Sequence, residues 1–256
     1  MLEQEQVFHQ FRLRLKEAIK ILIESKITYM CLKYGFRLKE EQQLKLSQFL
    51  IFLIEVNKKM NLTAIVEPDE IVLKHFIDSL MVEKLVKIDQ NARVLDVGAG
   101  AGFPSIPIAI VRPDLKMVQI DCLSKRVKFL KQVSNLLNLK TEVVHGRAEE
   151  LGKSVVFRER FNFVVARAVA PLNRLLEYCL PFVKVGGLFV ALKGQNFAIE
   201  MEEAENAVKE LGGNFEQVEQ FSLGSAGKRV LILIRKISQT ATKYPRINSK
   251  IVKSAL

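Results

Sequence analysis

From Asn91 onward, short apolar segments alternate with helical segments, and a glycine-rich loop follows the first apolar segment. Strands that alternate with helices form a parallel sheet, because a helix carries the chain back across one face between successive strands. The pattern therefore predicts an α/β fold with helices on both faces of a mostly parallel sheet. The strands are expected at 93–97, 117–121, 141–145, 161–167 and 188–193.

The last two apolar segments, 215–221 and 228–236, are joined by the short connection SLGSAG and have no helix between them. Such a connection predicts an antiparallel hairpin at one end of the sheet. Together the segments predict a seven-stranded sheet, with 91–236 as the α/β domain.

The chain before Asn91 reads as helical. Apolar residues recur at three- and four-residue spacing over 4–34, and further helices are expected at about 39–56 and 70–85. We therefore expect a helical N-terminal region at 1–90, in which 1–35 is an extension. A basic tail at 237–256 follows the α/β domain.

Composition excludes several classes of protein. No apolar run approaches the roughly 18 residues that a membrane span requires. Three cysteines and three histidines are few for a disulfide framework or a metal centre. Glu3 and Glu5 stand where a targeting signal would be basic or free of acids. We therefore expect a cytoplasmic monomer with no membrane contact and no metal.

Most of the net charge of +11 lies near the C-terminal end. Residues 228–256 contain no Asp or Glu, and their basic residues are Lys228, Arg229, Arg235, Lys236, Lys243, Arg246, Lys250 and Lys253. Such a patch favours a polyanionic partner such as nucleic acid, and a tail that only confers solubility is the alternative. We expect these residues to contact RNA phosphates. Removal of 237–256 should then weaken RNA binding and leave the affinity for a cofactor nearly intact.

The loop after the first strand is the best candidate for a ligand site. Glycines at Gly98, Gly100 and Gly102 allow a sharp turn and let a ligand approach main-chain amides. Phe103 stands where a dinucleotide fingerprint has its third glycine, and the loop lacks the lysine of a P-loop. Asp96 would repel a pyrophosphate and suit an ammonium group. The loop therefore favours a cationic, amino-acid-like ligand.

Two further positions follow neighbouring strands. Asp121 ends the second strand, where a carboxylate can accept hydrogen bonds from both hydroxyls of a ribose. After the third strand, main-chain groups of 146–149, which include Ala148 and Glu149, could meet an adenine ring. Taken singly, Asp96 and Asp121 could be helix-cap or turn residues. At successive strand ends they favour a ribose-containing ligand, either NAD or S-adenosylmethionine, and the missing glycine disfavours an NAD-dependent dehydrogenase.

With these motifs assembled, the chain resembles the class I S-adenosylmethionine-dependent methyltransferases, which have a Rossmann-like fold, and in detail the RsmG (GidB) family. The resemblance rests on ordered segments from Asn61 onward: NLTAI, KHFIDSL, DVGAGAGFP, DCLSKRVKFL, GRAEEL, ARAVAPL, ALKG and YPR. It implies S-adenosylmethionine as cofactor, bound at Gly98, Phe103, Ala148, Glu149 and Arg167. It also implies 16S ribosomal RNA of the small subunit as partner. Val56, Ser105 and Cys122 depart from the family's usual tryptophan, glycine and serine, and the tail INSKIVKSAL lacks its glycine and prolines.

The acceptor atom can be narrowed by what the chain lacks. Cys122 and Cys179 are expected to pack, which leaves no nucleophile for carbon methylation of a pyrimidine. No N/D-P-P-Y/F loop follows the fourth strand, and Arg167 stands where a ribose methyltransferase has an aspartate. An endocyclic base nitrogen needs no general base and is the simplest acceptor, and the family resemblance implies guanine nitrogen 7. No residue is assigned as catalytic, and the alternative function is a non-catalytic RNA-binding or ribosome-associated factor with the same fold.

Two other positions are candidates for contact with RNA. His75 and Asp78 lie three residues apart on one helical face, and could contact RNA or form a satisfied polar face. Lys193 ends the fifth strand before Gly194 and is a candidate for a phosphate contact, with a solvated lysine as the alternative.

Overall fold

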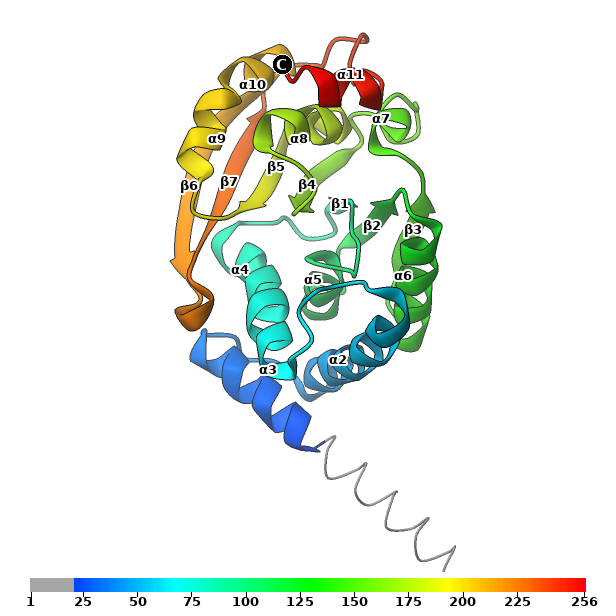
Figure 1. Cartoon of the computed structure of the whole chain (residues 1–256), viewed down its shortest axis with the longest axis vertical. Coiled ribbons are helices and arrows are strands. Elements are labelled where there is room, and N and C mark those ends of the chain that lie inside the picture. The colour runs from blue at the N-terminus through cyan, green and yellow to red at the C-terminus, as the bar shows by residue number, and fades with distance from the viewer. Residues whose placement is uncertain (1–20) are drawn as a thin grey trace, which may run out of the picture.

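A seven-stranded sheet forms the centre of the computed structural model, which describes residues 21–256 (Figure 1). The strand order is β3-β2-β1-β4-β5-β7-β6, and β7 runs antiparallel to both of its neighbours. The α/β fold and the C-terminal hairpin are therefore confirmed. The strands are β1 (Arg93–Val97), β2 (Lys116–Asp121), β3 (Thr141–His145), β4 (Phe161–Arg167), β5 (Val183–Lys193), β6 (Gly213–Ser222) and β7 (Lys228–Lys236).

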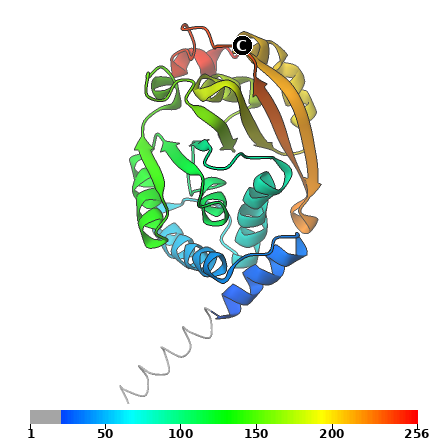
Figure 2. The same cartoon turned by 180° about the vertical axis from the view of Figure 1, so that it is seen from behind.

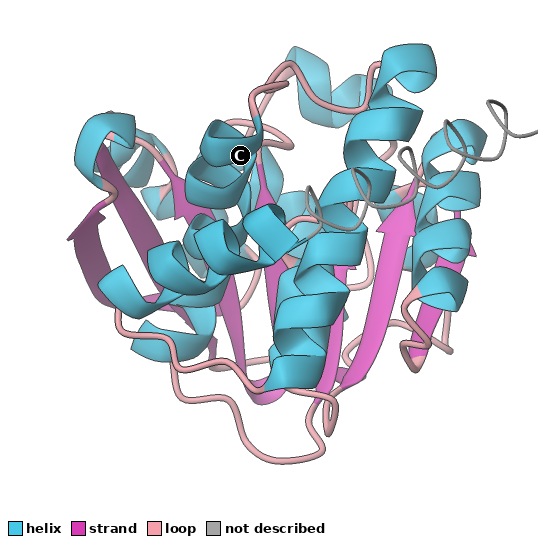
Figure 3. Cartoon of the chain, turned by 90° about the horizontal axis from the view of Figure 1, so that it is seen from below, coloured by secondary structure: helices cyan, strands magenta, loops and turns pink. Residues whose placement is uncertain are grey.

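Helices cover both faces of this sheet (Figure 3). On β1, Leu95 and Val97 face the core that includes α8, whereas Val94 faces the core that includes α5. This alternation is the two-residue period of a strand buried on both sides. The helices of the α/β part are α5 (Ser105–Val111), α6 (Ser124–Leu136), α7 (Ala148–Leu151), α8 (Leu172–Cys179), α9 (Phe197–Glu203), α10 (Glu205–Glu210) and α11 (Asn248–Lys253), with short 3₁₀ turns η2 (Leu180–Phe182) and η3 (Gly224–Ala226).

The N-terminal part is helical, as the sequence predicts. A helix at 21–33 precedes α2 (Glu40–Met60), and then α3 (Pro68–Ile71), a π-helical turn η1 (Val72–Ile77) and α4 (Asp78–Leu85) run on without a break. Phe49 of α2 and Phe76 of η1 stack in one core with Phe129 of α6 nearby. Residues 1–20 lie outside the described residues, and so does that part of the predicted helix 4–34.

The boundaries differ from the prediction in one place that matters for the site. The sequence pattern predicts a single helix over 171–183, but α8 ends at Cys179, η2 follows, and β5 begins at Val183. Pro181 lies in this turn and cannot donate the backbone hydrogen bond that a continuing helix needs.

The C-terminal segment 237–256 is not a free tail. Tyr244 and Ile251 are buried in the core beside α8, and Arg158 donates hydrogen bonds to the carbonyl oxygens of Thr240 and Tyr244 at 2.6 and 2.8 Å. Figures 1 and 2 show α11 lying next to α8 and α7. Segment 237–256 is thus part of the folded body.

Within residues 21–256, no helix has the length and apolar character needed to cross a membrane.

Candidate active site

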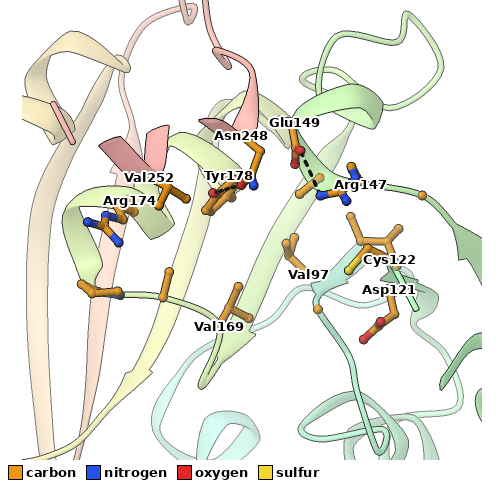
Figure 4. A pocket seen from close by; sticks show the side chains of 16 residues that line it. Val97, Asp121, Cys122, Arg147, Glu149, Val169, Arg174, Tyr178, Asn248 and Val252 are labelled. Atoms are coloured by element: carbon orange, nitrogen blue, oxygen red, sulfur yellow. Dashed lines mark hydrogen bonds and ion pairs between the residues drawn. The ribbon is translucent and has the colours of Figure 1, made fainter. Parts of the chain in front are cut away.

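A cavity of about 320 Å³ opens at the carboxyl ends of β1, β2 and β3, where the sequence places its ligand site (Figure 4). Small-molecule sites in open α/β sheets lie at this edge. We call it the first cavity. Its lining residues are Val97, Gly98, Ile120, Asp121, Cys122, Gly146, Arg147, Ala148, Glu149, Val169, Ala170, Pro171, Arg174, Tyr178, Asn248 and Val252.

Gly98 forms the floor of the first cavity and cannot be replaced without strain. Its φ of +73° lies in the left-handed region, and a Cβ there would stand 2.8 Å from Cγ2 of Val169. The backbone amides of Gly98 and Ala99 donate hydrogen bonds to the carbonyl oxygen of Ile120 at 2.9 and 3.1 Å. These bonds hold the loop against β2, so a ligand in the cavity meets main chain and not side chains at this point.

Asp121 joins the glycine loop to the wall of the first cavity. Its Oδ2 accepts a hydrogen bond from the Gly100 amide at 3.0 Å, and its Oδ1 accepts one from the Leu123 amide at 2.8 Å. A carboxylate has about four lone-pair sites, so each oxygen keeps the capacity to accept another donor. Arg126 lies 3.6 Å from Oδ2. The side chain is therefore fixed at the cavity edge as a hydrogen-bond acceptor.

Asp96 lies behind the wall of the first cavity and not in it. The residue is 0% exposed, and its Oδ2 accepts a hydrogen bond from the Ser105 amide at 3.2 Å. Burial raises the pKa of this carboxyl to about 6, and the hydrogen bonds from Ser105 lower it in part. Asp96 is placed to tie the glycine loop to the start of α5.

A second cavity of about 390 Å³ lies on the other side of the segment that follows β4. Arg167 and Ala168 line the second cavity, whereas Val169 and Ala170 line the first. One short stretch of chain therefore separates the two. The second cavity is lined by Ile65, Lys74, His75, Asp78, Arg167, Ala168, Leu192, Lys193, Gly194, Arg229, Val230 and Leu231.

Arg167 organises the second cavity. Its Nη1 donates hydrogen bonds to Oδ2 of Asp78 at 2.9 Å and to the carbonyl oxygen of Lys74 at 3.1 Å, and its Nη2 lies 3.0 Å from Nδ1 of His75. The guanidinium also lies over the ring of Phe103, 5.2 Å from its centroid. Arg229 Nε is 3.8 Å from the other oxygen of Asp78. A buried carboxylate thus holds two arginines at the cavity wall.

His75 is neutral in this arrangement. Burial and the neighbouring Arg167 lower its pKa from 6.5 to about 3. Its ring stacks on Phe103 at 4.5 Å between centroids, and Nε2 lies 2.9 Å from the Thr63 hydroxyl. Lys74 and His75 sit in the π-helical turn η1, a feature frequent at functional sites. The neutral ring connects the NLTAI loop to Arg167.

Comparison with known proteins shows which family the chain belongs to. The family model GidB, described as rRNA small subunit methyltransferase G, matches residues 42–231. The chain belongs to the GidB family.

Its relatives align over most of their length. The chain is 49% identical over 211 residues to ribosomal RNA small subunit methyltransferase G of Thermoanaerobacter sp. (strain X514), covering 82% of this chain and 88% of that protein. The protein of the same name from Acetivibrio thermocellus is 49% identical over 225 residues, covering 87% and 92%.

Solved structures support the fold. A SAM-dependent O-methyltransferase from Thermotoga maritima matches with a TM-score of 0.51 and 16% identity, over 74% of this chain and 72% of that one.

The predicted cofactor residues of this GidB family member fall into three places. Gly98, Asp121, Ala148 and Glu149 line the first cavity. Asp96, Gly100, Gly102 and Phe103 are not among its lining residues: Asp96 is buried behind the wall, and the other three belong to the glycine loop. Arg167, which the family resemblance assigns to the cofactor, faces the second cavity.

The predicted RNA contacts are also divided. His75, Lys193 and Arg229 line the second cavity, and Lys228 is exposed beside it. Lys193 Nζ is already engaged with Glu200 Oε2 at 2.6 Å and the Ala170 carbonyl oxygen at 2.8 Å. Arg246 lies elsewhere and pairs with buried Glu177 at 2.7 Å.

One expected phosphate contact is wrong. Lys236 is 0% exposed, and its ammonium group donates to the carbonyl oxygen of Leu180 and to the Thr240 hydroxyl, with Glu159 at 3.4 Å. Burial lowers its pKa to about 8. A cation enclosed in this way cannot reach an RNA phosphate.

Sequence reasoning missed the wall of the first cavity opposite the sheet. Arg174 and Tyr178 come from α8, and Asn248 and Val252 come from α11. Reasoning from strand ends cannot find them, because helix faces carry them to the site, and α11 comes from a distant part of the chain.

Proposed function

We propose that the chain transfers a methyl group from S-adenosylmethionine to nitrogen 7 of a guanine in 16S ribosomal RNA of the small subunit. The observation that carries the proposal is the pair of cavities on either side of segment 167–171. Methyl transfer is an in-line displacement, so donor and acceptor must be held close together in fixed orientation. Two cavities that share one loop supply that arrangement.

The first cavity fits the donor. Asp121 offers acceptor oxygens for ribose hydroxyls, Gly98 lets the loop lie close to Val169 without a Cβ between them, and segment 146–149 provides main-chain groups for the purine. When bound, S-adenosylmethionine supplies an electrophilic methyl group on a sulfonium centre. The chain orients it and excludes water from its apolar side through Val97, Ile120 and Val252.

The second cavity fits a nucleotide acceptor. Lys74, Arg167, Lys193 and Arg229 bring positive charge to its wall, which suits the phosphate backbone and the electron-rich edge of a purine. Neutral His75 and the engaged carboxylate of Asp78 are poor candidates for removing a proton from an amine or hydroxyl. Guanine nitrogen 7 carries a lone pair and no proton, so orientation alone suffices.

The cysteines support the same acceptor. Cys31 and Cys179 are buried, burial raises the pKa of both thiols, and neither lines the first or the second cavity. The expectation that Cys122 packs is wrong: its side chain is exposed and lines the first cavity beside Asp121, on the donor's side. No described cysteine therefore lies where a nucleophile could attack an acceptor base. Among residues 21–256, no group of three or more His, Cys, Asp or Glu side chains is placed to hold a metal ion.

The place of action follows from the substrate. We infer a cytoplasmic monomer that binds 16S ribosomal RNA or the assembled small subunit. The basic rim of the second cavity, which includes Lys228 and Arg229, supports the RNA partner. Contacts between these side chains and phosphates would position the RNA without reading its sequence.

A cleavage assay tests the acceptor atom. Methylation at guanine nitrogen 7 leaves a positive charge on the purine, and borohydride followed by aniline cuts RNA at that nucleotide. Small-subunit RNA incubated with the protein and S-adenosylmethionine should be cut at one new guanine, and the Cys122→Ala variant should produce the same cut. Methyl incorporation without cleavage would overturn the nitrogen 7 assignment. RNA and cofactor binding without any incorporation would favour the non-catalytic RNA-binding factor.

A further inference from the structure

Part of one wall of the first cavity comes from outside the part of the chain that the family model matches. That match ends at residue 231, whereas Asn248 and Val252 of α11 line the cavity together with Tyr178 of α8. Figure 4 shows Asn248 and Tyr178 on one side of the cavity and Asp121 and Cys122 on the other. We call the three residues Tyr178, Asn248 and Val252 the C-terminal wall.

The C-terminal wall is anchored. Arg246 donates from Nε to Oε1 of Glu177 at 2.9 Å and from Nη2 to Oε2 at 2.7 Å, a two-point pairing with a carboxylate that is 0% exposed. Ile251, on the same helix as Asn248, is also 0% exposed. Helix α11 is therefore held against α8 from two sides, and its cavity-facing residues have a defined position.

The amide of Asn248 has one end engaged and one end available. Tyr178 donates its hydroxyl proton to Oδ1 of Asn248 at 2.6 Å, which fixes the direction of the amide. Within residues 21–256, no hydrogen bond engages Nδ2 of Asn248. Its two N–H groups are donors at the cavity wall that lack a protein acceptor.

The position of Asn248 relates it to the purine end of the cavity. Asn248 lies beside Glu149 and Arg147, with which it also lines a neighbouring hollow, and these residues flank Ala148. Under the proposed function, the Asp121 carboxylate would accept hydrogen bonds from the ribose, and Cys122 and segment 146–149 would then lie on the side of the purine. Adenine has ring nitrogens that act only as acceptors, which match a free amide donor.

We infer that Asn248 binds the adenine ring of the cofactor by donating an N–H to one of its ring nitrogens, with Tyr178 as the residue that positions the amide. Val252 supplies apolar contact on the same wall. The inference rests on the proposed use of S-adenosylmethionine, and it extends the cofactor site to a helix beyond the family match.

Calorimetry on the full chain tests the assignment. S-adenosylhomocysteine is titrated into the wild type, Asn248→Ala and the control Lys250→Ala, which lies on the exposed face of the same helix. Loss of one hydrogen bond should weaken binding roughly three- to tenfold in Asn248→Ala and leave the control unchanged. Tyr178→Phe should give a smaller loss, since the amide keeps its donors and loses its fixed direction. Thermal unfolding of each variant reports whether α11 stays docked.

Analogues identify the contact. Three analogues of S-adenosylhomocysteine, each with one acceptor ring nitrogen replaced by C–H, are titrated into the wild type and Asn248→Ala. The analogue that lacks the contacted nitrogen should bind the wild type more weakly than S-adenosylhomocysteine does. The same analogue and S-adenosylhomocysteine should bind Asn248→Ala with equal affinity. If Asn248→Ala weakens the parent and all three analogues equally, or weakens none, the inference is wrong. If the wild type binds no S-adenosylhomocysteine and no S-adenosylmethionine, the proposed function itself fails.

Discussion

The two cavities are of similar size and share one loop, but the groups that hold their buried carboxylates differ. The first combines strand ends, main chain of the glycine loop and apolar side chains with the charged Asp121, Arg147, Glu149 and Arg174, and the carboxylate of Asp121 is held by backbone amides. In the second, the carboxylate of Asp78 is held by the side chains of Arg167 and Arg229. We therefore expect main-chain shape to contribute more to ligand binding in the first cavity and paired side-chain charges to contribute more in the second.

Gly98→Asp should produce the largest effect and confine it to the first cavity. An aspartate there would be strained at φ +73° and would place a side chain within 2.8 Å of Val169. We expect the affinity for S-adenosylmethionine to fall about 100-fold or more, because the side chain enters the ligand's space. The control is Gly194→Ala in the second cavity, where an added Cβ meets nothing within 4 Å. Unchanged calorimetric affinity in Gly98→Asp would break the assignment of the first cavity to the donor.

His75, in the wall of the second cavity, should make the free energy of unfolding of the chain depend on pH. Its pKa is about 3 in the folded chain against an ordinary 6.5, so protons bind the unfolded chain more tightly. The stabilisation is therefore complete above pH 6.5 and is lost as pH falls from 6.5 toward 3. Between pH 7 and pH 5 the loss is about 2 kcal/mol.

The measurement is denaturant unfolding at both pH values for the wild type, His75→Gln and His145→Gln. His145 is exposed and serves as the matched control. His75→Gln should lose less stability than the wild type between pH 7 and pH 5, and other titrating groups cancel in that difference. Equal losses in the wild type and His75→Gln would mean that His75 is not held neutral.

Arg167→Lys should affect the second cavity and leave the first nearly unchanged. Lysine keeps the charge, but it cannot contact Asp78, the Lys74 carbonyl and His75 together as the planar guanidinium does. We expect turnover to fall roughly tenfold through misplacement of the acceptor, with cofactor affinity changed by less than about twofold. A parallel loss of cofactor affinity in calorimetry would show instead that Arg167 contacts the donor, as the family resemblance implies.

Lys228→Ala should have the smallest effect. Lys228 is exposed next to Arg229, so removing its charge should weaken RNA binding about two- to threefold and reduce the salt slope of the logarithmic affinity by about 1. Lys116→Ala removes an exposed lysine at the opposite edge of the sheet, where β2 begins, and provides the control. Identical salt slopes for the two variants would remove Lys228 from the RNA interface.

The sequence predicts the strand-end half of the site because topology places it. Gly98 and Ala148 each follow a parallel strand and Asp121 ends one, and the carboxyl ends of adjacent parallel strands meet at one edge. The strand β1 at 93–97 and the hairpin with β7 follow from the same local patterns. These features depend on periodicity and on short connections, both of which are visible in the residues themselves.

The other half depends on packing between distant segments. A count of charges treats Arg246 and Lys236 as surface cations. In the structure Arg246 pairs with Glu177 and Lys236 pairs with Glu159, inside the folded body. Asn248 reaches the cavity because Ile251 is buried against α8. The expectation that removing 237–256 leaves the cofactor site intact rests on a free tail, which the structure contradicts. Charge density alone does not reveal which cations already have a partner inside the protein.

The wall contributed by α11 links cofactor binding to the docking of the C-terminal segment. All seven strands are complete at Lys236, so a chain in which α11 has come away from α8 keeps every strand of the sheet. Such a chain has the glycine loop and Asp121 but a cofactor cavity that is open on one side. Because a ligand stabilises only the state that binds it, the cofactor favours chains in which α11 has docked. Tight cofactor binding would thus mark chains in which α11 is docked, and the cofactor and the docked helix would each protect the other against local unfolding.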